Sequence, residues 1–480
     1  MDFLNRQNRF IKIEQADKDY IQKIYNTTQN DAYYPKFHIA PKHGLLNDPN
    51  GLCQIDGTHH IFYQWFPLGP VHGLKYWYHL STIDFINYKD LGISIAPDMD
   101  YDSHGCYSGS TFIENDKAYI YYTSNKKVED TFIQNQVIAR LENNKVTKEK
   151  VIIKNHKNHK THEFRDPIVY KKDNKYIMLV GAQNKDDEGV IEIYISENLY
   201  NFKYHKNLKF SDKNIAHMIE CPNYYEEDNK GILIFSPQGL DSDENNKYDF
   251  KNVFSVVYMI GDKIDVENGE FNSRKIYELD KGFDFYAPQV YKDEQNRNIM
   301  IGWLGNSKNT YPTDKSNWAH MLTLPREIKI INNKIHQYVI NEFDSLKNEK
   351  IKIDKEIKLQ RKQFYLELDV DKDFELKLYN KEGENIIFKA DEYEFVLDRS
   401  NMSEVYATNF GTKRYAKRNI LKQTINVWAD SSSIEIFCDD GQTVFTSRVF
   451  IDNLDTLSIK NIDATISYID EINIPYKNIK

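Results

Sequence analysis

Three carboxylates in the sequence lie in short polar stretches that separate apolar runs. Two of them immediately precede a proline, and the third is separated from a proline by one residue. Asp48 lies in Asn-Asp-Pro-Asn-Gly, Asp166 in Phe-Arg-Asp-Pro and Glu220 in Met-Ile-Glu-Cys-Pro. Proline fixes its own φ and restricts the residue before it, so a carboxylate beside such a turn can be held with little freedom. Taken singly, each motif is more often an ordinary turn or a structural acid than a site.

The elements that must position these carboxylates are short strands. Between residues 34 and 328, apolar or alternating runs such as 59–65, 118–122 and 191–195 recur between Asp, Asn, Gly and Lys residues and predict β-strands. The polar stretches between them are spaced at 60, 58, 54 and 64 residues if they are anchored on Asp48, Ser108, Asp166, Glu220 and Asp284. Four-stranded propeller blades repeat at about 40–50 residues, so the spacing predicts five slightly long blades. Chance choice of anchors remains the alternative.

The domain organisation follows from changes in composition and in the spacing of apolar residues along the chain. Apolar positions at helical spacing predict a helical segment over residues 1–33, followed by a five-bladed β-propeller over 34–328. A charged, mixed stretch over 329–350 is typical of a linker, and closely spaced strands over 351–480 predict a β-sandwich. We therefore expect an all-β protein of two domains, which suits a length of 480 residues.

Composition excludes several classes of partner. A net charge of −9 argues against nucleic acid, and no apolar run is long enough to span a membrane. The first residues lack the apolar core of a signal peptide, so the expected location is the cytoplasm. Four scattered cysteines have no metal-ligand spacing, and we expect no metal and no cofactor. His156, His159 and His162 could bind a metal incidentally, but a solvated loop is the preferred interpretation. The sequence leaves the oligomeric state open.

The motifs and their flanks together resemble glycoside hydrolase family 32, which contains the invertases, fructanases and sucrose-6-phosphate hydrolases. Gly44-Leu45-Leu46 and Phe62-Tyr63-Gln64-Trp65 flank the first motif as in the family's opening signature, and the resemblance covers nearly all of the chain after about residue 34. It implies that Asp48 is the nucleophile and Glu220 the general acid/base. Asp166 would bind fructose hydroxyls and stabilise the transition state.

The resemblance also implies a set of substrate-binding residues: Leu45, Leu46, Asn47, Gln64, Tyr107, Ser108, Arg165, Asp284, Tyr286 and Trp303. Arg165 is expected to hold Asp166 ionised, because a neighbouring positive charge lowers a carboxyl pKa. Asp48 is expected to stay ionised as well, which leaves Glu220 as the proton donor. For Tyr286 and Trp303, burial in the core is the alternative.

Departures from the secreted invertases favour the intracellular sucrose-6-phosphate hydrolases of the family. Leu45-Leu46 replaces Trp-Met, Trp77-Tyr78-His79 replaces Trp-Gly-His, and His72 stands where a tryptophan is frequent. Three carboxylates repel an anionic substrate, so a phosphate requires positive charge near the mouth of the site. We expect His72 and Lys75 at that rim; a solvated rim lysine is the alternative.

The sequence thus predicts a retaining β-fructofuranosidase that acts on sucrose 6-phosphate, with sucrose as a secondary substrate. An intracellular invertase or fructo-oligosaccharide hydrolase is an alternative within the same class. A non-catalytic sugar-binding propeller is the alternative from another class, because a fold alone does not decide between binding and catalysis. A binding module has no need for three acids at Asp48, Asp166 and Glu220.

Overall fold

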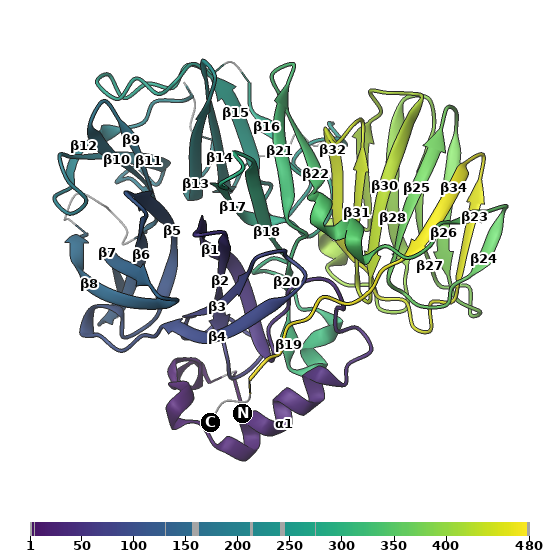
Figure 1. The fold of residues 1–480 in the computed structure, drawn as a ribbon, viewed down its shortest axis with the longest axis horizontal. Helices are drawn as coiled ribbons and strands as arrows, with labels where there is room; N and C mark the ends of the chain where they lie inside the picture. Colours follow the sequence, from purple (N-terminus) through teal and green to yellow (C-terminus); the bar gives the residue numbers. More distant parts are fainter. Residues whose placement is uncertain are drawn as a thin grey trace.

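The structure is a computed structural model that describes residues 2–477 except 4, 130, 156–162, 212–214, 241–244 and 274. Strands dominate it, as the sequence predicts. Figure 1 shows two bodies side by side, one built from the earlier sheets and one from the yellow-green sheets at the end of the chain. No helix in the described ranges is long and apolar enough to cross a membrane.

The chain begins with helical elements: η1 (Arg6–Phe10), η2 (Ile13–Gln15) and α1 (Lys18–Gln29). The helix α1 starts after Asp17, whose carboxylate accepts a hydrogen bond of 2.8 Å from the backbone N–H of Tyr20. Its buried residues are Ile21, Ile24 and Thr28, which share one face at spacings of three and four. The amphipathic helix that the sequence predicts is therefore present.

Five sheets follow the helical segment. The first consists of β1 (Gly44–Ile55), β2 (Thr58–Phe66), β3 (Tyr76–Thr82), β4 (Tyr88–Ile95) and β19 (Trp318–Ala319). The second, after η3 (Asp100–Asp102), consists of β5 (Cys106–Glu114), β6 (Lys117–Val128), β7 (Thr131–Glu142) and β8 (Lys145–Ile153). The third consists of β9 (Phe164–Lys172), β10 (Lys175–Gln183), β11 (Gly189–Ser196) and β12 (Lys203–Asn207).

The remaining two sheets complete the series. The fourth consists of β13 (Met218–Glu227), β14 (Lys230–Gln238), β15 (Val257–Gly261) and β16 (Tyr277–Glu278). The fifth, interrupted by η4 (Pro312–Ser316), consists of β17 (Tyr286–Lys292), β18 (Asn298–Leu304), β20 (Met321–Leu322), β21 (Arg326–Ile331) and β22 (Lys334–Val339).

The first strands of the five sheets form a closed ring. Contacts run from β1 to β5, β9, β13 and β17 in turn, and β17 contacts β1 again. The ring is also closed by β19, which pairs in parallel with β1 although it lies far later in the chain. Five sheets around a shared axis are a five-bladed propeller, so the predicted fold class is confirmed for this part.

The fifth sheet extends beyond the boundary that the sequence suggests. The strand β22 pairs with β21 along its length, from Arg326 opposite Val339 to Ile331 opposite Lys334. Residues 329–339 therefore belong to the propeller, and only 340–350, with η5 (Asn341–Leu346), remain as a connection. The sequence pattern does not indicate this edge hairpin, because an edge strand is partly exposed and therefore mixes polar with apolar residues.

The rest of the chain forms two six-stranded sheets, with η6 (Thr408–Phe410) between strands. One sheet consists of β23 (Ile351–Ile353), β34 (Asp463–Tyr468), β25 (Phe364–Val370), β30 (Gln423–Asp430), β31 (Ser433–Cys438) and β32 (Thr443–Arg448). The other consists of β24 (Glu356–Lys358), β33 (Thr456–Lys460), β26 (Phe374–Tyr379), β27 (Asn385–Ala390), β28 (Glu394–Asn401) and β29 (Lys413–Lys417). Their alternating apolar residues make one core, which confirms the predicted β-sandwich.

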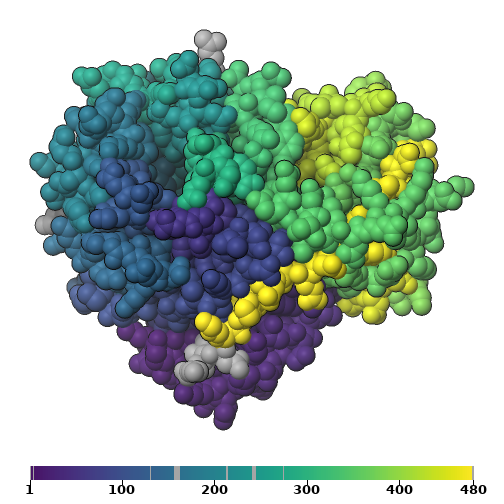
Figure 2. All heavy atoms as spheres, viewed as in Figure 1, coloured from purple at the N-terminus to yellow at the C-terminus, as the bar shows by residue number. Residues whose placement is uncertain are grey.

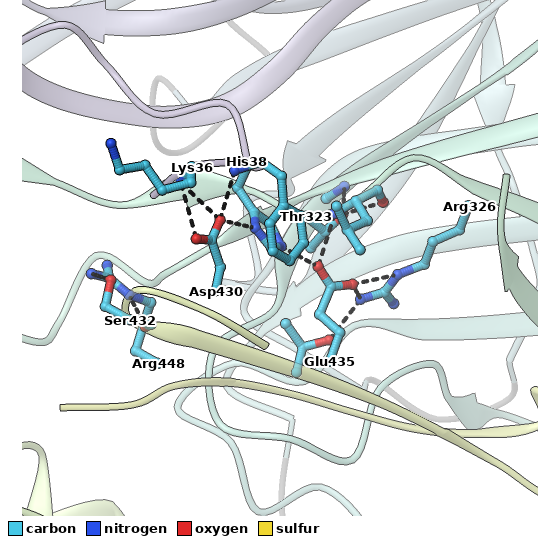
Figure 3. A network of polar contacts seen from close by, with 12 residues as sticks. Lys36, His38, Thr323, Arg326, Asp430, Ser432, Glu435 and Arg448 are labelled. Atoms are coloured by element: carbon cyan, nitrogen blue, oxygen red, sulfur yellow. Dashed lines mark hydrogen bonds and ion pairs between the residues drawn. The ribbon is translucent and has the colours of Figure 1, made fainter. Parts of the chain in front are cut away.

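A buried polar network joins the two domains (Figure 3). The ring of His38 bridges two sandwich carboxylates, with Nδ1 2.8 Å from Asp430 Oδ2 and Nε2 2.9 Å from Glu435 Oε1. Arg326 of the propeller donates to the same Glu435 from Nε and Nη2 at 3.1 and 2.5 Å. Burial alone would lower the pKa of His38, but the two carboxylates outweigh burial and raise this pKa to about 9.

The end of the chain returns from the sandwich to the first blade. The yellow C-terminal segment runs back towards the purple N-terminal helices in Figures 1 and 2. The backbone N–H of Ile472 donates to Lys36 O at 3.0 Å, and that of Asn473 donates to Ile86 O at 2.8 Å. This segment therefore fastens the sandwich to the propeller at a second place.

Candidate active site

A cavity of about 780 Å³ lies where the first strands of the blades converge. Most of the site residues that the sequence predicts line it: Asn47, Asp48, Gln64, His72, Lys75, Tyr107, Ser108, Arg165, Asp166, Glu220, Tyr286 and Trp303. The three carboxylates come from β1, β9 and β13, three strands of the inner ring. Residues that are distant in sequence are thus brought to one surface by the closure of the propeller.

The inner strands position these residues by breaking their pairing at the same level. In each blade, the register with the second strand shifts across one or two residues of the inner strand, which include Asp48, Ser108, Asp166, Cys221 and Ala287 in turn. A proline follows in four of the five blades: Pro49, Pro167, Pro222 and Pro288. Proline has no N–H, so the interruption leaves no backbone donor unpaired there. The bulges turn side chains out of the regular pleat.

The second blade uses glycine in place of proline. A Cβ at Gly109 would lie 1.9 Å from the backbone oxygen of Tyr121, so only glycine allows β5 and β6 to approach this closely. The hydroxyl of the preceding residue, Ser108, then reaches Asp48. In the third, fourth and fifth blades, Asp166, Cys221 and Ala287 instead adopt positive φ of 66°, 47° and 43°.

Asp48 is held by donors on both of its oxygens. Ser108 Oγ donates to Oδ2 at 2.5 Å and Asn47 Nδ2 donates to Oδ1 at 3.0 Å. Gln64 supports both donors, because its Nε2 donates to Ser108 Oγ at 2.7 Å and its Oε1 accepts from Asn47 Nδ2 at 2.5 Å. Burial raises the pKa of Asp48, while the hydrogen bonds from Ser108 and Asn47 lower it in part. These donors favour the ionised, nucleophilic form.

Arg165 contacts Glu220 rather than the adjacent Asp166, which corrects the expectation from sequence. Its Nε and Nη2 donate to Glu220 Oε1 at 2.9 and 2.8 Å. Tyr286 Oη and Gln238 Nε2 donate to Oε2 of the same glutamate at 2.7 and 2.6 Å. Burial alone would raise the pKa of Glu220, but the guanidinium and these hydrogen bonds lower it. Adjacency in sequence does not decide this contact, because β9 has a bulge at Asp166, whose φ is positive, and Glu220 of the neighbouring blade reaches the guanidinium.

Asp166 is a second carboxylate whose pKa is raised, here to about 7. Burial is the main cause, and the charge of Arg165 opposes it only in part. The backbone N–H of Cys221 donates to Asp166 Oδ2 at 2.9 Å. The thiol of Cys221 lies 3.5 Å from that oxygen and 3.8 Å from Asp48 Oδ2, so it stands between two of the carboxylates. Between these two carboxylates, the proton is therefore favoured on Asp166 over Glu220.

Lys75 lies deep in the cavity and not at its rim, which corrects a second expectation. Its Nζ donates to Asn47 Oδ1 at 2.6 Å, and its side chain is buried. Burial lowers the pKa of Lys75 to about 7, against the attraction of Asp48. Lys75 immediately precedes β3, whose pairing with β2 carries it towards the first motif. This ammonium is thus placed beside the candidate nucleophile.

His72 lines the cavity as a neutral ring. Burial lowers its pKa well below the usual range, and Lys75 adds to this effect. Its ring centroid lies 5.9 Å from that of Trp303. Within the described part of the chain, His72 Nε2 is buried and has no hydrogen-bond partner. A neutral imidazole can bind a sugar hydroxyl, but it does not supply the positive charge that we expected of it.

Three predicted binding residues do not line the cavity. Leu45 and Leu46 are both buried in the apolar core, since β1 is covered on both faces. Asp284 precedes β17 and is buried at the junction of the domains. Its carboxylate accepts hydrogen bonds from Tyr311 Oη at 2.6 Å and from Tyr406 Oη at 2.5 Å. The fifth blade therefore presents Tyr286 to the cavity, two residues after the anchor that the spacing suggested.

Several other residues line the cavity although the sequence did not predict them as site residues. Gln238, at the end of β14, reaches Glu220, and Asn125 and Gln134 of β6 and β7 line another wall. Phe10 comes from the N-terminal helical segment. Only Cys221 lay in a motif; the others depend on pairing and packing between segments far apart in the chain. His156, His159 and His162 lie outside the described residues.

Three carboxylates that meet in one cavity are the kind of group that a glycoside hydrolase uses as nucleophile and acid. The chain belongs to glycosyl hydrolases family 32: its N-terminal domain model matches residues 38–340 and its C-terminal model residues 332–474.

Named relatives agree with this assignment. The chain is 43% identical over 461 residues to the sucrose-6-phosphate hydrolase of Vibrio alginolyticus, covering 95% of this chain and 94% of that protein. The structure of sucrose-6-phosphate hydrolase from Lactobacillus gasseri superposes with a TM-score of 0.92 at 31% identity, covering 98% and 100% of the two chains. A mutant of the Bombyx mori family 32 β-fructofuranosidase in complex with sucrose has a TM-score of 0.82 at 26% identity, covering 97% and 100%.

Proposed function

We propose that this glycoside hydrolase is a retaining β-fructofuranosidase that cleaves sucrose 6-phosphate to glucose 6-phosphate and fructose, and cleaves sucrose more slowly. The observation that carries the proposal is the meeting of Asp48, Asp166 and Glu220 in one cavity large enough for a disaccharide. The 43% identity to a sucrose-6-phosphate hydrolase over nearly the whole chain supports the choice of substrate.

The proposed reaction proceeds in two displacements. Asp48 attacks the anomeric carbon of the fructosyl unit while Glu220 gives a proton to the departing glucosyl oxygen. Water, deprotonated by Glu220, then attacks the same carbon and restores the carboxylate of Asp48. Two inversions give net retention, so fructose leaves as the β-anomer. The backbone-anchored Asp166 is placed to bind fructosyl hydroxyls.

The acid role of Glu220 requires a change of its partners. Arg165 and two further donors stabilise the ionised form of Glu220. Arg165 also contacts Glu163 at the cavity wall through Nη1. A leaving-group oxygen inserted between Arg165 and Glu220 would remove the cation from the carboxylate, and burial would then raise its pKa. Substrate binding thus prepares the acid.

We place this reaction in the cytoplasm. Its substrate carries a phosphate, and the four cysteines, Cys53, Cys106, Cys221 and Cys438, are free thiols, as is usual in a reducing compartment.

The test is to measure kcat/KM of the purified protein on sucrose 6-phosphate and on sucrose. We expect a preference for the phosphorylated sugar of at least about tenfold, the smallest effect of one charge-assisted contact. Cleavage of both sugars at equal kcat/KM would instead identify an intracellular invertase, and faster cleavage of short fructans would identify a fructo-oligosaccharide hydrolase. Absence of any cleavage would leave a sugar-binding propeller.

A further inference from the structure

A ladder of side chains leads from the carboxylates to the mouth of the cavity along β6 and β7. Residues directly opposite in an antiparallel pair share one face, and every second pair repeats on that face. The successive pairs here are Thr123 with Gln136, Asn125 with Gln134, and Lys127 with Phe132. Asn125, Gln134 and Phe132 all line the cavity, so this face of the hairpin looks into it.

The ladder has a defined inner and outer end. At its inner end Thr123 Oγ1 accepts the backbone N–H of Asp166 at 3.0 Å. Lys127 stands four residues further along β6, about 13 Å from Thr123 at the rise of an extended strand. A lysine side chain can reach part of the way back. Lys127 therefore stands at the outer end of the ladder, opposite the cavity-lining Phe132 on the neighbouring strand.

An aromatic ring from the N-terminal segment packs against the outer end of this ladder. The ring of Phe10 lies 6.3 Å from that of Phe132 and 5.4 Å from that of His104. Phe10 is fixed there because the backbone of the preceding Arg9 accepts a hydrogen bond of 2.7 Å from the N–H of Leu74. Such rings offer a stacking surface to a pyranose, as aromatic walls do in sugar sites.

The two lysines of this strand differ in their surroundings. Lys126 points to the other face and donates to both oxygens of Asp100 at 2.7 and 2.6 Å. Lys127 is exposed and, among the residues that the structure describes, has no hydrogen bond or ion pair. The charges of Lys127 and, to a smaller extent, Lys126 add to burial in lowering the pKa of the His104 ring. Lys127 is thus an uncompensated cation beside the aromatic mouth.

We propose that Lys127, on the wall formed by Phe132 and Phe10, binds the phosphate of the leaving glucosyl unit and so sets the preference for a phosphorylated disaccharide. This rests on the proposed function, and it gives Lys127 the role that the sequence suggested for Lys75. The charges nearer the carboxylates are already engaged: Lys75 with Asn47, and Arg165 with Glu220 and Glu163. A phosphate at the mouth would meet Lys127 first.

The experiment compares kcat/KM on sucrose 6-phosphate and on sucrose for the wild type, Lys127→Met, Lys127→Glu and the matched control Lys126→Met. Lys127→Met should lower the ratio of the two values by about ten- to hundredfold, and Lys127→Glu by more. Lys126→Met should keep the ratio of the wild type. Added salt should narrow the preference of the wild type more than that of Lys127→Met.

A second readout separates binding from any change in fold. Inhibition by glucose 6-phosphate should weaken in Lys127→Met, whereas inhibition by fructose should keep its wild-type constant. If wild type prefers the phosphorylated sugar and Lys127→Met keeps that preference, the assignment of Lys127 is wrong while the proposed function stands. If wild type itself shows no preference, both the proposed substrate and this assignment are overturned.

Discussion

Arg165 and Glu220 form a two-point ion pair inside the cavity, with Nε and Nη2 of the arginine 2.9 and 2.8 Å from one carboxylate oxygen. The guanidinium is fixed by a second glutamate, Glu163, on its other side. An acid catalyst that such a pair holds ionised acquires its proton when the pair is disturbed. The pair therefore couples the occupancy of the site to the protonation of Glu220.

Replacing Arg165 should shift the pH profile. The alkaline limb of kcat/KM reports the acid of the free enzyme, which we take to be Glu220. Since Arg165 lowers the pKa of Glu220, Arg165→Gln should raise that pKa and move the alkaline limb up by about 1–3 pH units. The profile is measured on sucrose, with Arg165→Lys as the variant that keeps a positive charge and should shift less. An alkaline limb that stays in place in Arg165→Gln would show that this pair does not control the acid.

The role of Glu220 can be tested through the leaving group. Glu220→Gln should slow cleavage of sucrose by about 10²–10⁴-fold, because glucose is a poor leaving group that requires a proton. A fructoside with an activated leaving group needs no proton in the first step and should form the fructosyl-enzyme at close to the wild-type rate, as measured by the burst of released leaving group. Equal losses of that first step on both substrates would contradict the acid role.

Lys75→Met should impair both sugars alike. Its ammonium lies on Asn47, one residue from the candidate nucleophile, and so affects the fructosyl half that sucrose and sucrose 6-phosphate share. Losing this contact should lower kcat/KM by about ten- to hundredfold for each, as for one charge-assisted hydrogen bond. Parallel measurements on the two substrates decide the matter. If kcat/KM fell only for sucrose 6-phosphate, Lys75 would be the residue that binds the phosphate.

The sequence predicted the propeller and the position of the carboxylates well, and for physical reasons. Strand 59–65 was found as β2 (Thr58–Phe66), because its aromatic and β-branched residues are buried on both faces. The spacing of Asp48, Ser108, Asp166 and Glu220 follows the inner strands, since each blade repeats one strand order around the axis. Asp284 does not follow this spacing, because in the fifth blade Tyr286 is the residue that lines the cavity.

What the sequence could not predict depends on contacts between distant segments. The partner of Arg165 depends on the bulge in β9 and on Glu220 of the neighbouring blade, and the depth of Lys75 depends on the pairing of β2 with β3. Phe10 reaches the cavity only because its segment hydrogen-bonds to Leu74 on the first blade. Local composition carries no signal for such contacts.

His38, which lies between the two domains, should make the free energy of unfolding depend on pH. Its folded-state pKa of about 9 exceeds the unfolded value of 6.5, so its contribution is fully present below about pH 6.5 and is lost as the pH rises through 9. His38→Leu leaves Asp430 and Glu435 short of a partner and should cost about 3–5 kcal/mol. Thermal midpoints at pH 6 and pH 9 test this: the difference between variant and wild type should be smaller at pH 9. An equal difference at both pH values would contradict the assigned charge.

Detection of a covalent intermediate on Asp48 is the most direct test of the proposed retaining mechanism. In Glu220→Gln, an activated fructoside should load the enzyme faster than water can unload it, because the general base is missing. Acid quenching, proteolysis and mass spectrometry should then find one fructosyl residue on the peptide that contains Asp48, and none in Asp48→Asn/Glu220→Gln. A fructosyl group on a different carboxylate, or α-fructose as the first product seen by NMR of the wild type, would contradict the account.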